Sequence, residues 1–420
     1  MTDGEKTLSR RDFLKGSAAA VAAASVGLIS SARAQEAGDE VEPIRCGFIG
    51  VGSQGSMLLG KALRVPGVKM AGICDIYPPH LKRGLEIAGT ARGYTDYRWM
   101  LERKDIQAIF IATPLYLHAP MAIDAMQAGK HVFSEKMMAY SIDDAKAMAK
   151  TARDTGKLLQ IGHQRRYNAL YNHAYKLIKE GVLGKITHVR LMWNRNGSWR
   201  RAVPDPQYER LINWRMYSDY SQGLMAELGS HQLHVANWFL EASPISVMGM
   251  GGIDYWKDGR EVYDNVSVVF EYPDGVKVYF QSLTTNQHDG CYEQFMGDKG
   301  TIVVTTDGAH LFPEPKAEEL VWSSMAHKEK VGGKEAILLD ADVTPRLKQQ
   351  AGTGEQLSTE GPKKDDYLLE VESFIACARE GKKPACDAIE GLQSAATCLL
   401  ANDAMAKGKK LTYKPDMFKI

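Results

Sequence analysis

A glycine-rich segment near the start of the chain has the residue types and the spacing of a phosphate-binding turn. Gly50, Gly52 and Gly55 form the pattern G-x-G-x-x-G, with Ser53 and Gln54 before the third glycine. The first glycine permits a tight turn, the second lets the backbone approach a pyrophosphate, and the third lets a helix pack closely on a strand. The amide groups at the start of that helix would face the phosphates. We therefore expect these residues to bind a dinucleotide.

Asp75 is the acid expected to complete such a site, because it ends the apolar run 68–74 that follows the glycine-rich segment. A carboxylate there can accept hydrogen bonds from both ribose hydroxyls of the adenosine, which favours NAD. Lys82 and Arg83 are close enough in sequence to leave NADP open. Strand, glycines, helix, second strand and acid occur in the required order, so we predict a NAD site.

His231 and Glu227 have the chemistry needed to oxidise an alcohol. A base must take the hydroxyl proton as hydride leaves the carbon, and histidine is the side chain best suited to this near neutral pH. On a regular helix Glu227 would share a face with His231, where it could orient the imidazole and stabilise its charged form. Taken alone, the two residues favour the other interpretation, that both are ordinary helix residues, His231 in the core and Glu227 in solvent.

A basic and aromatic group follows the last strand pattern of the first half of the chain. His163, Arg166 and Tyr167 are candidates for binding a substrate there, although a solvated helix face is the alternative for each. His234 is a candidate acid/base, a substrate contact or a core residue. The same weighing applies to a further polar and aromatic group: Trp193, Asn194, Arg195 and Trp199.

Alternating elements must position these groups. Strand patterns lie at 44–49, 68–74, 108–112, 131–134 and 158–161, and helical patterns lie at 56–64, 118–128 and 141–155. The alternation predicts an α/β fold with a doubly wound parallel sheet, whose ligands bind at the carboxyl ends of the strands. The segments that follow those strands carry Thr113, Pro114, His118, Glu135 and Lys136.

The later part of the chain is predicted to form an α+β domain with a large, mostly antiparallel open sheet. Its strand patterns lie at 187–192, 246–251, 265–272, 276–283 and 301–305, and Pro273-Asp274-Gly275 indicates a turn. Residues 316–365 are charged and glycine-rich, which indicates an insertion. The predicted order is a signal peptide (1–34), a linker (35–43), a Rossmann domain (44–163), a substrate-binding and oligomerisation domain (164–365), and C-terminal helices with a tail (366–420).

The N-terminus has the pattern of a twin-arginine signal. Ser9-Arg10-Arg11-Asp12-Phe13-Leu14-Lys15 precedes an apolar run too short to cross a bilayer, and Ala32-Arg33-Ala34 fits a cleavage site. We predict export to the periplasm or the medium, with the twin-arginine translocon as a partner and no stable membrane anchor. Because this route carries folded proteins, it already points to a bound cofactor.

Composition excludes some partners and predicts no metal. Lys and Arg number 52 against 51 Asp and Glu, so nothing draws the whole chain to nucleic acid or to an anionic membrane. The six cysteines form no C-x-x-C pair and have no histidine at metal-ligand spacing, so we expect them to be buried small hydrophobes.

Together the motifs resemble the Gfo/Idh/MocA superfamily, named for glucose-fructose oxidoreductase, inositol dehydrogenase and a rhizopine-catabolism protein. The resemblance covers nearly all of the mature chain: the glycine-rich loop, T-P-x-x-x-H at 113–118, G-K-H-V-F-S-E-K at 129–136, G-K-I at 184–186 and G-S-H at 229–231. It implies that Lys136 approaches the nicotinamide and the substrate hydroxyl, that His231 is catalytic, and that the chain forms a homo-oligomer.

Two departures from the family pattern matter. The family proline after the lysine is Met137, which removes a fixed φ. The usual D-x-x-x-H with an aspartate three residues later is kept only in part, as Glu227, His231 and His234.

The resemblance and the export signal imply an NAD(P)-dependent oxidoreductase acting on a secondary hydroxyl of a sugar, polyol or glycoside. Nicotinamide cofactors are scarce outside the cytoplasm, so the enzyme is expected to keep and recycle its own. One alternative is a redox-neutral glycosidase that works by oxidation, elimination and hydration, with an extra acid/base from His234, Tyr167 or His163. Another is a non-catalytic sugar or cofactor sensor.

Overall fold

The computed structural model describes residues 42–305, 308–350 and 365–420. The predicted signal peptide and nearly all of the predicted linker therefore lie outside the described residues. Residues Ile44–Ile420 belong to one unit, which contains both parts of the fold.

The first part of this unit is a parallel six-stranded sheet in the order β3-β2-β1-β4-β5-β6. The prediction of a doubly wound parallel fold is confirmed. Its strands are β1 (Ile44–Ile49), β2 (Val68–Cys74), β3 (Arg92–Tyr94), β4 (Ala108–Ile111), β5 (His131–Glu135) and β6 (Leu159–Gly162). Its helices are α2 (Ser53–Ala62), α3 (Pro78–Ala88), α4 (Tyr97–Leu101), α5 (His118–Gln127) and α6 (Ile142–Thr155).

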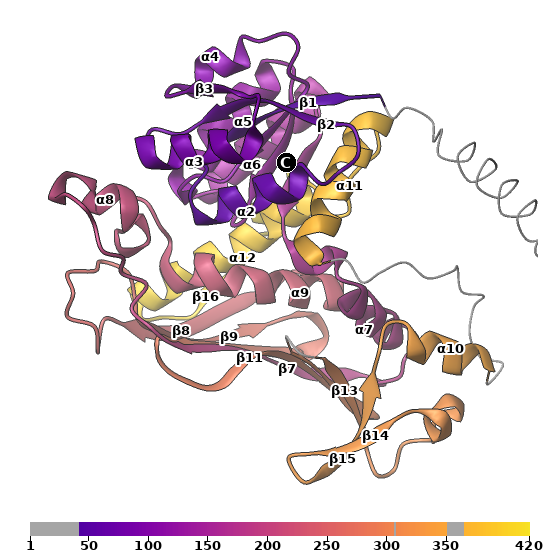
Figure 1. Cartoon of the computed structure of the whole chain (residues 1–420). Helices are drawn as coiled ribbons and strands as arrows, with labels where there is room; N and C mark the ends of the chain where they lie inside the picture. The colour runs from indigo at the N-terminus through magenta and orange to yellow at the C-terminus, as the bar shows by residue number, and fades with distance from the viewer. Residues whose placement is uncertain (1–41, 306–307, 351–364) are drawn as a thin grey trace, which may run out of the picture. The chain divides into compact units, whose positions relative to one another are not determined.

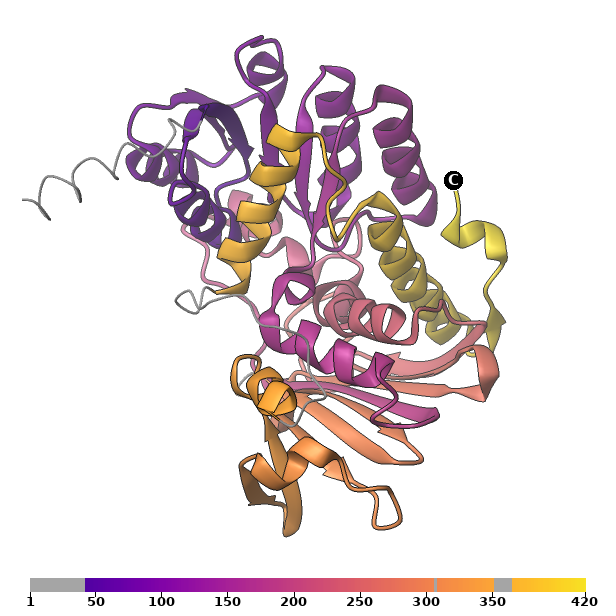
Figure 2. The ribbon, with the colours of Figure 1, turned by 90° about the vertical axis from the view of Figure 1, so that its right-hand side faces the viewer.

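Helix α11 (Asp366–Glu380), from the far end of the chain, completes the core of this sheet. The Phe374 ring lies 5.0 Å from that of Phe110 on β4 and 5.8 Å from that of Phe133 on β5, measured between centroids. In Figures 1 and 2 this helix lies beside α2. The two C-terminal helices therefore pack on different elements. Helix α11 lies beside α2, whereas α12 (Ala388–Lys407) packs on α6, α9 and β8.

The second part is built on a sheet with ten strands among the described residues, in the order β14-β15-β13-β12-β11-β7-β10-β9-β8-β16. Every pairing is antiparallel except β7 with β10, so the predicted mostly antiparallel sheet is confirmed. The strands are β7 (Ile186–Asn196), β8 (Ser246–Gly252), β9 (Asn265–Glu271), β10 (Lys277–Leu283), β11 (Thr285–Gly297), β12 (Gly300–Thr305), β13 (Ala309–Pro313), β14 (Lys328–Val331), β15 (Lys334–Leu339) and β16 (Leu411–Thr412).

Five of the ten described strands of this sheet are absent from the prediction: β11, β13, β14, β15 and β16. Strand β11 was missed because its first half, T-N-Q-H-D-G, is polar and shows no alternation. Part of the predicted insertion 316–365 belongs to the sheet, since β14 and β15 extend it at one edge. The predicted turn at Pro273–Gly275 is present between β9 and β10.

Helix α9 (Ser230–Leu240) lies in the interior of the second part, packed on β7 and on α12. Nearly every residue of the helix is buried, and the Asn237 side chain links it to Thr397 of α12 and to Tyr272. A π-helical turn, Met225–Gly229, leads directly into it. The remaining helices are α7 (Ala169–Lys179), α8 (Glu209–Ile212) and α10 (Val343–Gln350).

The cysteines are all free, as expected of core residues, although Cys291 and Cys377 are only partly buried. Among the described residues, no helix has both the length and the apolarity to cross a membrane.

Candidate active site

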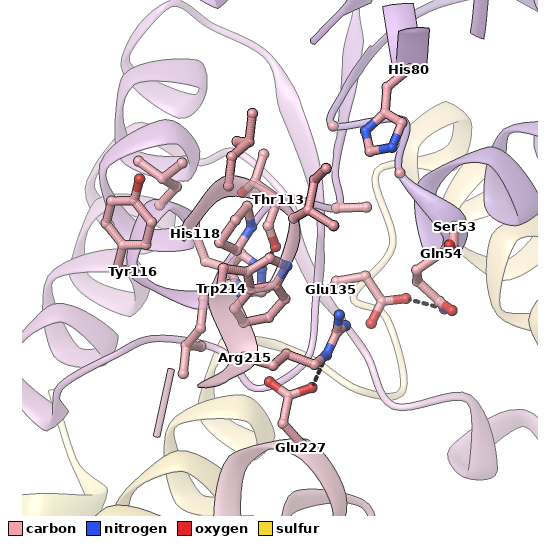
Figure 3. A pocket seen from close by; sticks show the side chains of 18 of the residues that line it. Ser53, Gln54, His80, Thr113, Tyr116, His118, Glu135, Trp214, Arg215 and Glu227 are labelled. Atoms are coloured by element: carbon pink, nitrogen blue, oxygen red, sulfur yellow. Dashed lines mark hydrogen bonds and ion pairs between the residues drawn. The ribbon is translucent and has the colours of Figure 1, made fainter. Parts of the chain in front are cut away.

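A cavity of about 590 Å³ lies where the carboxyl ends of the parallel strands meet the second part of the chain (Figure 3). Most residues predicted for cofactor binding and catalysis line it. They are Gly50, Gly52, Ser53, Gln54, Asp75, Thr113, Pro114, His118, Glu135, Lys136, Glu227 and His231.

Close backbone contacts require two of the glycines, Gly50 and Gly55. Gly50 has a φ of +83°, and a Cβ built on it would lie 2.7 Å from the carbonyl oxygen of Ala112. A Cβ on Gly55 would lie 1.9 Å from the carbonyl oxygen of Gly50, which no adjustment of side chains could relieve. Gly55 does not line the cavity, so it serves the packing of helix on strand.

The start of α2 is free to receive an anion. Its N-cap residue, Gly52, makes no side-chain cap, and the first turn has no acid. Amide groups of this kind bind phosphate through hydrogen bonds and the helix dipole. Arg201, from the segment after β7, donates from Nη1 to Ser53 Oγ at 3.0 Å and brings a positive charge to the same place.

Asp75 is held by backbone amides at the edge of the cavity. Its Oδ2 accepts from Val51 N and its Oδ1 from Tyr77 N, both at 2.8 Å, and its side chain is 9% exposed. Each carboxylate oxygen retains capacity for another bond, which a ribose hydroxyl would use.

Arg83 donates from its guanidinium to Val51 O at 2.8 Å and to Ser56 Oγ at 3.0 Å. Neither Arg83 nor Lys82 lines the cavity. The glycine cradle, the uncapped helix start and the placed carboxylate together fit NAD.

Lys136 lines the cavity and is partly buried. Its Nζ donates to the carbonyl oxygen of Glu227 at 2.9 Å and to that of Ala226 at 3.4 Å. Burial lowers its pKa, while the carboxylates of Glu227 and Glu135 act to raise it. The peptide bond between Lys136 and Met137 is cis.

Glu135 is fixed by Gln54, whose Nε2 donates to Oε1 at 2.7 Å (Figure 3). The backbone amide of Lys136 donates to its Oε2 at 3.1 Å. Burial raises the pKa of this carboxyl group.

Glu227 does not orient His231 as predicted. Its Oε2 accepts from Arg215 Nε at 2.8 Å, and Figure 3 shows these two side chains pointing at each other. The prediction assumed an α-helix, but the π-helical turn at Met225–Gly229 widens the spiral and takes residues four apart off a common face. Burial acts to raise the pKa of Glu227, yet the charges of Arg215 and Lys136 hold it below its usual value.

His231 lines the cavity as a neutral imidazole. It is 8% exposed, and its Nδ1 is buried without a hydrogen-bond partner among the described residues. Burial, followed by the positive charges of Lys136 and Arg165, holds its pKa well below 6.5. The ring is therefore in the form that accepts a proton at neutral pH.

His118 joins two of the predicted cofactor segments. Its ring nitrogens lie 2.9 Å from the carbonyl oxygen of Met137 and 3.0 Å from that of Thr113. Burial lowers its pKa. It thereby holds the segment after β4 against the one after β5.

The residues predicted to bind substrate do not line the cavity. The ring of His163 stacks on that of His234 at 4.2 Å, and Tyr167 Oη accepts from the amide of Cys386 at 3.2 Å. Arg166 and His234 line a separate cavity of about 350 Å³. The reason is that the turn after β6 runs inward, where α9 and the segment before α12 cover its side chains.

Two family models match the chain. One, described as "Oxidoreductase family, NAD-binding Rossmann fold", matches residues 44–163, and one described as "Oxidoreductase family, C-terminal alpha/beta domain" matches 175–413. The chain belongs to the Gfo/Idh/MocA oxidoreductase family. A model of the twin-arginine translocation signal matches 7–27. The chain therefore contains an NAD-binding Rossmann domain of this oxidoreductase family and a signal for export by the twin-arginine pathway to the periplasm or beyond.

Curated relatives of this Gfo/Idh/MocA member carry the name "Glycosyl hydrolase family 109 protein". One from Shewanella baltica (strain OS185) is 31% identical over 234 residues, which is 50% of this chain and 50% of that protein. One from Shewanella amazonensis (strain ATCC BAA-1098 / SB2B) is 30% identical over 258 residues, 52% of this chain and 55% of that protein. The chain spans about half the length of these relatives.

Solved structures share the fold over most of the chain. An aldose-aldose oxidoreductase from Caulobacter crescentus, complexed with glycerol, is 20% identical with a TM-score of 0.68, covering 89% of this chain and 100% of that one. A levoglucosan dehydrogenase complexed with NADH is 18% identical with a TM-score of 0.71, with the same coverage.

Several cavity residues of this Gfo/Idh/MocA protein were not singled out from the sequence. Arg201, Trp214 and Arg215 come from the irregular segment between β7 and the π-helical turn, and Tyr367 comes from α11. The signal available was the density of arginine and tryptophan over 193–215. Arg195 and Arg201 have no ion pair with a carboxylate among the described residues, and burial, then Arg215, lowers the pKa of each.

Proposed function

We propose that the protein oxidises a secondary hydroxyl of a sugar, polyol or glycoside with an NAD that it retains between turnovers. The observation that carries this proposal is the meeting of the glycine cradle, Lys136 and His231 in one cavity. When bound, NAD supplies the hydride acceptor. The side chains of the cavity bind and orient the reactants and exchange protons with them.

His231 is proposed as the base. Its imidazole is neutral at physiological pH, and a substrate hydroxyl beside it would find a nitrogen able to accept its proton. Activity should fall as the pH drops through the lowered pKa of His231, which lies below 6.5. Lys136 is proposed to donate a hydrogen bond to the same hydroxyl, since two carbonyl groups already orient its ammonium.

The substrate end of the cavity suits a carbohydrate. Trp193, Trp199 and Trp214 line it together with Arg195 and Arg215. Aromatic planes pack against the apolar faces of a sugar, and guanidinium groups donate to its hydroxyls.

A redox-neutral glycosidase is the second candidate, supported by the names of the curated relatives. It needs a further acid/base, and the three residues predicted for this role lie outside the cavity. Glu135, whose pKa is raised by burial, is the cavity residue best suited to supply a proton.

The test begins with the mature exported protein, which is denatured so that any released nucleotide can be identified by mass spectrometry. A panel of sugars and aryl glycosides is then assayed. An oxidised sugar formed with a reduced co-substrate supports the oxidoreductase, whereas aryl release without net reduction supports the glycosidase. Protein free of nucleotide contradicts retention of the cofactor.

Lys136→Ala and His231→Ala test the assigned roles. Each should lower kcat by roughly 100-fold or more while nucleotide stays bound, because general acid/base catalysis contributes factors of that size. Lys69→Ala and His188→Ala change exposed residues of the same types and should leave kcat unaltered. Unchanged turnover in either cavity variant would remove that residue from the mechanism.

The predicted homo-oligomer and the domain boundaries stay predictions.

A further inference from the structure

A second cluster of reactive side chains lies outside the NAD cavity. His234 projects from α9, and Cys386 and Glu390 flank the start of α12. His234 Nε2 lies 3.1 Å from Glu390 Oε2 and 3.7 Å from Cys386 Sγ. One ligand atom from each of the three residues falls within 4.8 Å of the others. Cys386 and His234 are buried, and Glu390 is partly exposed.

The arrangement is not that of a hydrogen-bonded nucleophile. In a Cys-His-acid relay the acid holds one ring nitrogen while the thiol faces the other. Here the thiol and the carboxylate both face Nε2, and Nδ1 of His234 is buried without a hydrogen-bond partner among the described residues. Because one nitrogen cannot accept from the thiol and donate to the carboxylate at once, hydrogen bonding leaves one contact unmade.

A cation between the three atoms would use all of them. Zinc binds sulfur at about 2.3 Å and imidazole nitrogen at about 2.0 Å in tetrahedral geometry, which places neighbouring ligand atoms roughly 3.3–3.6 Å apart. The distances from His234 Nε2 to Glu390 Oε2 (3.1 Å) and to Cys386 Sγ (3.7 Å) are close to these ligand–ligand separations. One nitrogen, one sulfur and one oxygen form the ligand set that zinc takes among common divalent ions.

A fourth ligand has room beside the cluster. His234 and Glu390 both line the smaller cavity of about 350 Å³, which also gives a path for entry. We propose that His234, Cys386 and Glu390 form a binding site for a zinc-class divalent cation, with a water molecule from the smaller cavity as the fourth ligand.

Arg166 competes with such a cation for Glu390. Its Nε lies 3.5 Å from Oε1 and 3.4 Å from Oε2 of that carboxylate, and its guanidinium lies over the Trp238 ring at 4.3 Å. Metal affinity is therefore set partly by this arginine. The bound ion would join α9, which carries His231, to the segment that opens α12.

The site is tested by metal binding, which is independent of sugar turnover. Mature protein is stripped with a chelator, and Zn²⁺ affinity is measured against a chromogenic competitor. Co²⁺ is added separately to look for the near-ultraviolet charge-transfer band of a cobalt–thiolate bond. We expect one ion per chain, a thiolate band and a higher Tm with Zn²⁺.

Matched variants assign the ligands. Cys386→Ser and Glu390→Gln should each weaken Zn²⁺ roughly 100-fold or more, since loss of groups around a metal already costs 10- to 100-fold. Cys386→Ser should also abolish the thiolate band. Cys377→Ser changes a half-buried cysteine of α11 and should bind like the wild type. Arg166→Gln should bind more tightly.

Absence of the cobalt–thiolate band in the wild type would overturn the proposal, as would full Zn²⁺ affinity in Cys386→Ser. Should Cys386→Ser fail to fold, the band of the wild type and the affinity of Glu390→Gln decide the question. Loss of sugar oxidation with metal binding intact would count against the proposed function alone.

Discussion

Lys136 lies between opposing charges whose effects can be separated by mutation. The Glu227 and Glu135 carboxylates raise its pKa, and the Arg215 guanidinium lowers it. Arg215 and Glu227 pair with each other at 2.8 Å, so removing either one leaves the charge of the other uncompensated beside the lysine. The two changes should therefore have opposite signs.

Glu227→Gln should lower the pKa of Lys136, and Arg215→Gln should raise it. The protonated amine donates to the carbonyl groups of the π-helical turn, so activity should fall as the pH rises through its pKa. This fall is the alkaline limb of the pH profile of kcat/KM. We expect the limb to move down by about one pH unit in Glu227→Gln and up by a similar amount in Arg215→Gln. A shift of one pH unit corresponds to a change of about 1.4 kcal/mol in the interaction of the ammonium with its surroundings. Shifts of the same sign in both variants would contradict the assignment of the limb to Lys136.

At the scale of single residues, the sequence predicted most where a motif defines the backbone. The glycines, Asp75, Glu135 and Lys136 occupy loops whose course follows from the parallel fold, and they line or support the cavity. The prediction failed where side-chain direction depends on distant elements. His163 and Tyr167 face α9 and Cys386, contacts that join residues far apart in the chain. The pairing of Glu227 with Arg215 depends on a π-helical turn that spacing alone does not reveal.

Among the elements, helix α2 contains two glycines with different surroundings. A Cβ on Gly55 would clash with the backbone of Gly50, whereas a Cβ on Gly60 would meet nothing within 4 Å. Gly55→Ala should destabilise the protein by about 3 kcal/mol or more and abolish nucleotide binding, because strand and helix must separate. Gly60→Ala should be stabilising by up to about 1 kcal/mol, as expected inside a helix. Thermal unfolding and nucleotide content measure both, and equal effects would mean that Gly55 is not required for packing.

The segment between β7 and the π-helical turn reaches the nucleotide end of the cavity through Arg201. Its bond to Ser53 Oγ places a guanidinium at the start of α2, where a pyrophosphate would lie. Arg201→Ala should speed the release of NAD by roughly 10- to 100-fold, since a charge-assisted hydrogen bond contributes about 1.5–3 kcal/mol. Stopped-flow displacement measures the rate. Arg98→Ala, which changes an exposed arginine of α4, is the matched control, and equal rates in the two variants would exclude Arg201 from cofactor retention.

Element prediction succeeded for strands with strong apolar patterns and failed for β11. Strand β11 lies centrally in the large sheet, between β7 and β12, but its first half, T-N-Q-H-D-G, is polar and pairs with β7 only at Thr285 and Asn286 before the register shifts at Cys291. At one edge of the sheet, β14 is charged and is held by its pairing with β15. Such strands carry no periodicity from which a sequence could predict them.

For the molecule as a whole, buried histidines link stability to pH. Burial lowers the pKa of His118, His163 and His231, and it lowers that of His173 to about 4. The unfolded chain, with histidines near 6.5, binds more protons than the folded chain between those values. The stability contributed by these neutral rings is therefore present above about pH 6.5 and is lost as the pH falls. Burial raises the pKa of buried acids such as Glu370, and this changes stability with pH in the opposite direction. The effect of one histidine must therefore be measured by comparing a variant of that histidine with the wild type.

His173 on α7 is suited to that measurement, since its Nε2 is buried without a hydrogen-bond partner among the described residues and it does not line the NAD cavity. His173→Leu keeps an apolar side chain of similar size and removes the group that resists protonation. The pKa of His173 is about 4 in the folded protein and 6.5 in the unfolded chain. Between pH 7.5 and pH 5 the free energy of unfolding of the variant should therefore rise by up to about 2 kcal/mol relative to that of the wild type. Urea unfolding at both pH values, with nucleotide held constant, measures the difference. His188→Gln, which changes an exposed histidine of β7, should show no such gain. A difference between His173→Leu and wild type that stays constant with pH would show that this ring titrates in the folded protein as it does in the unfolded chain.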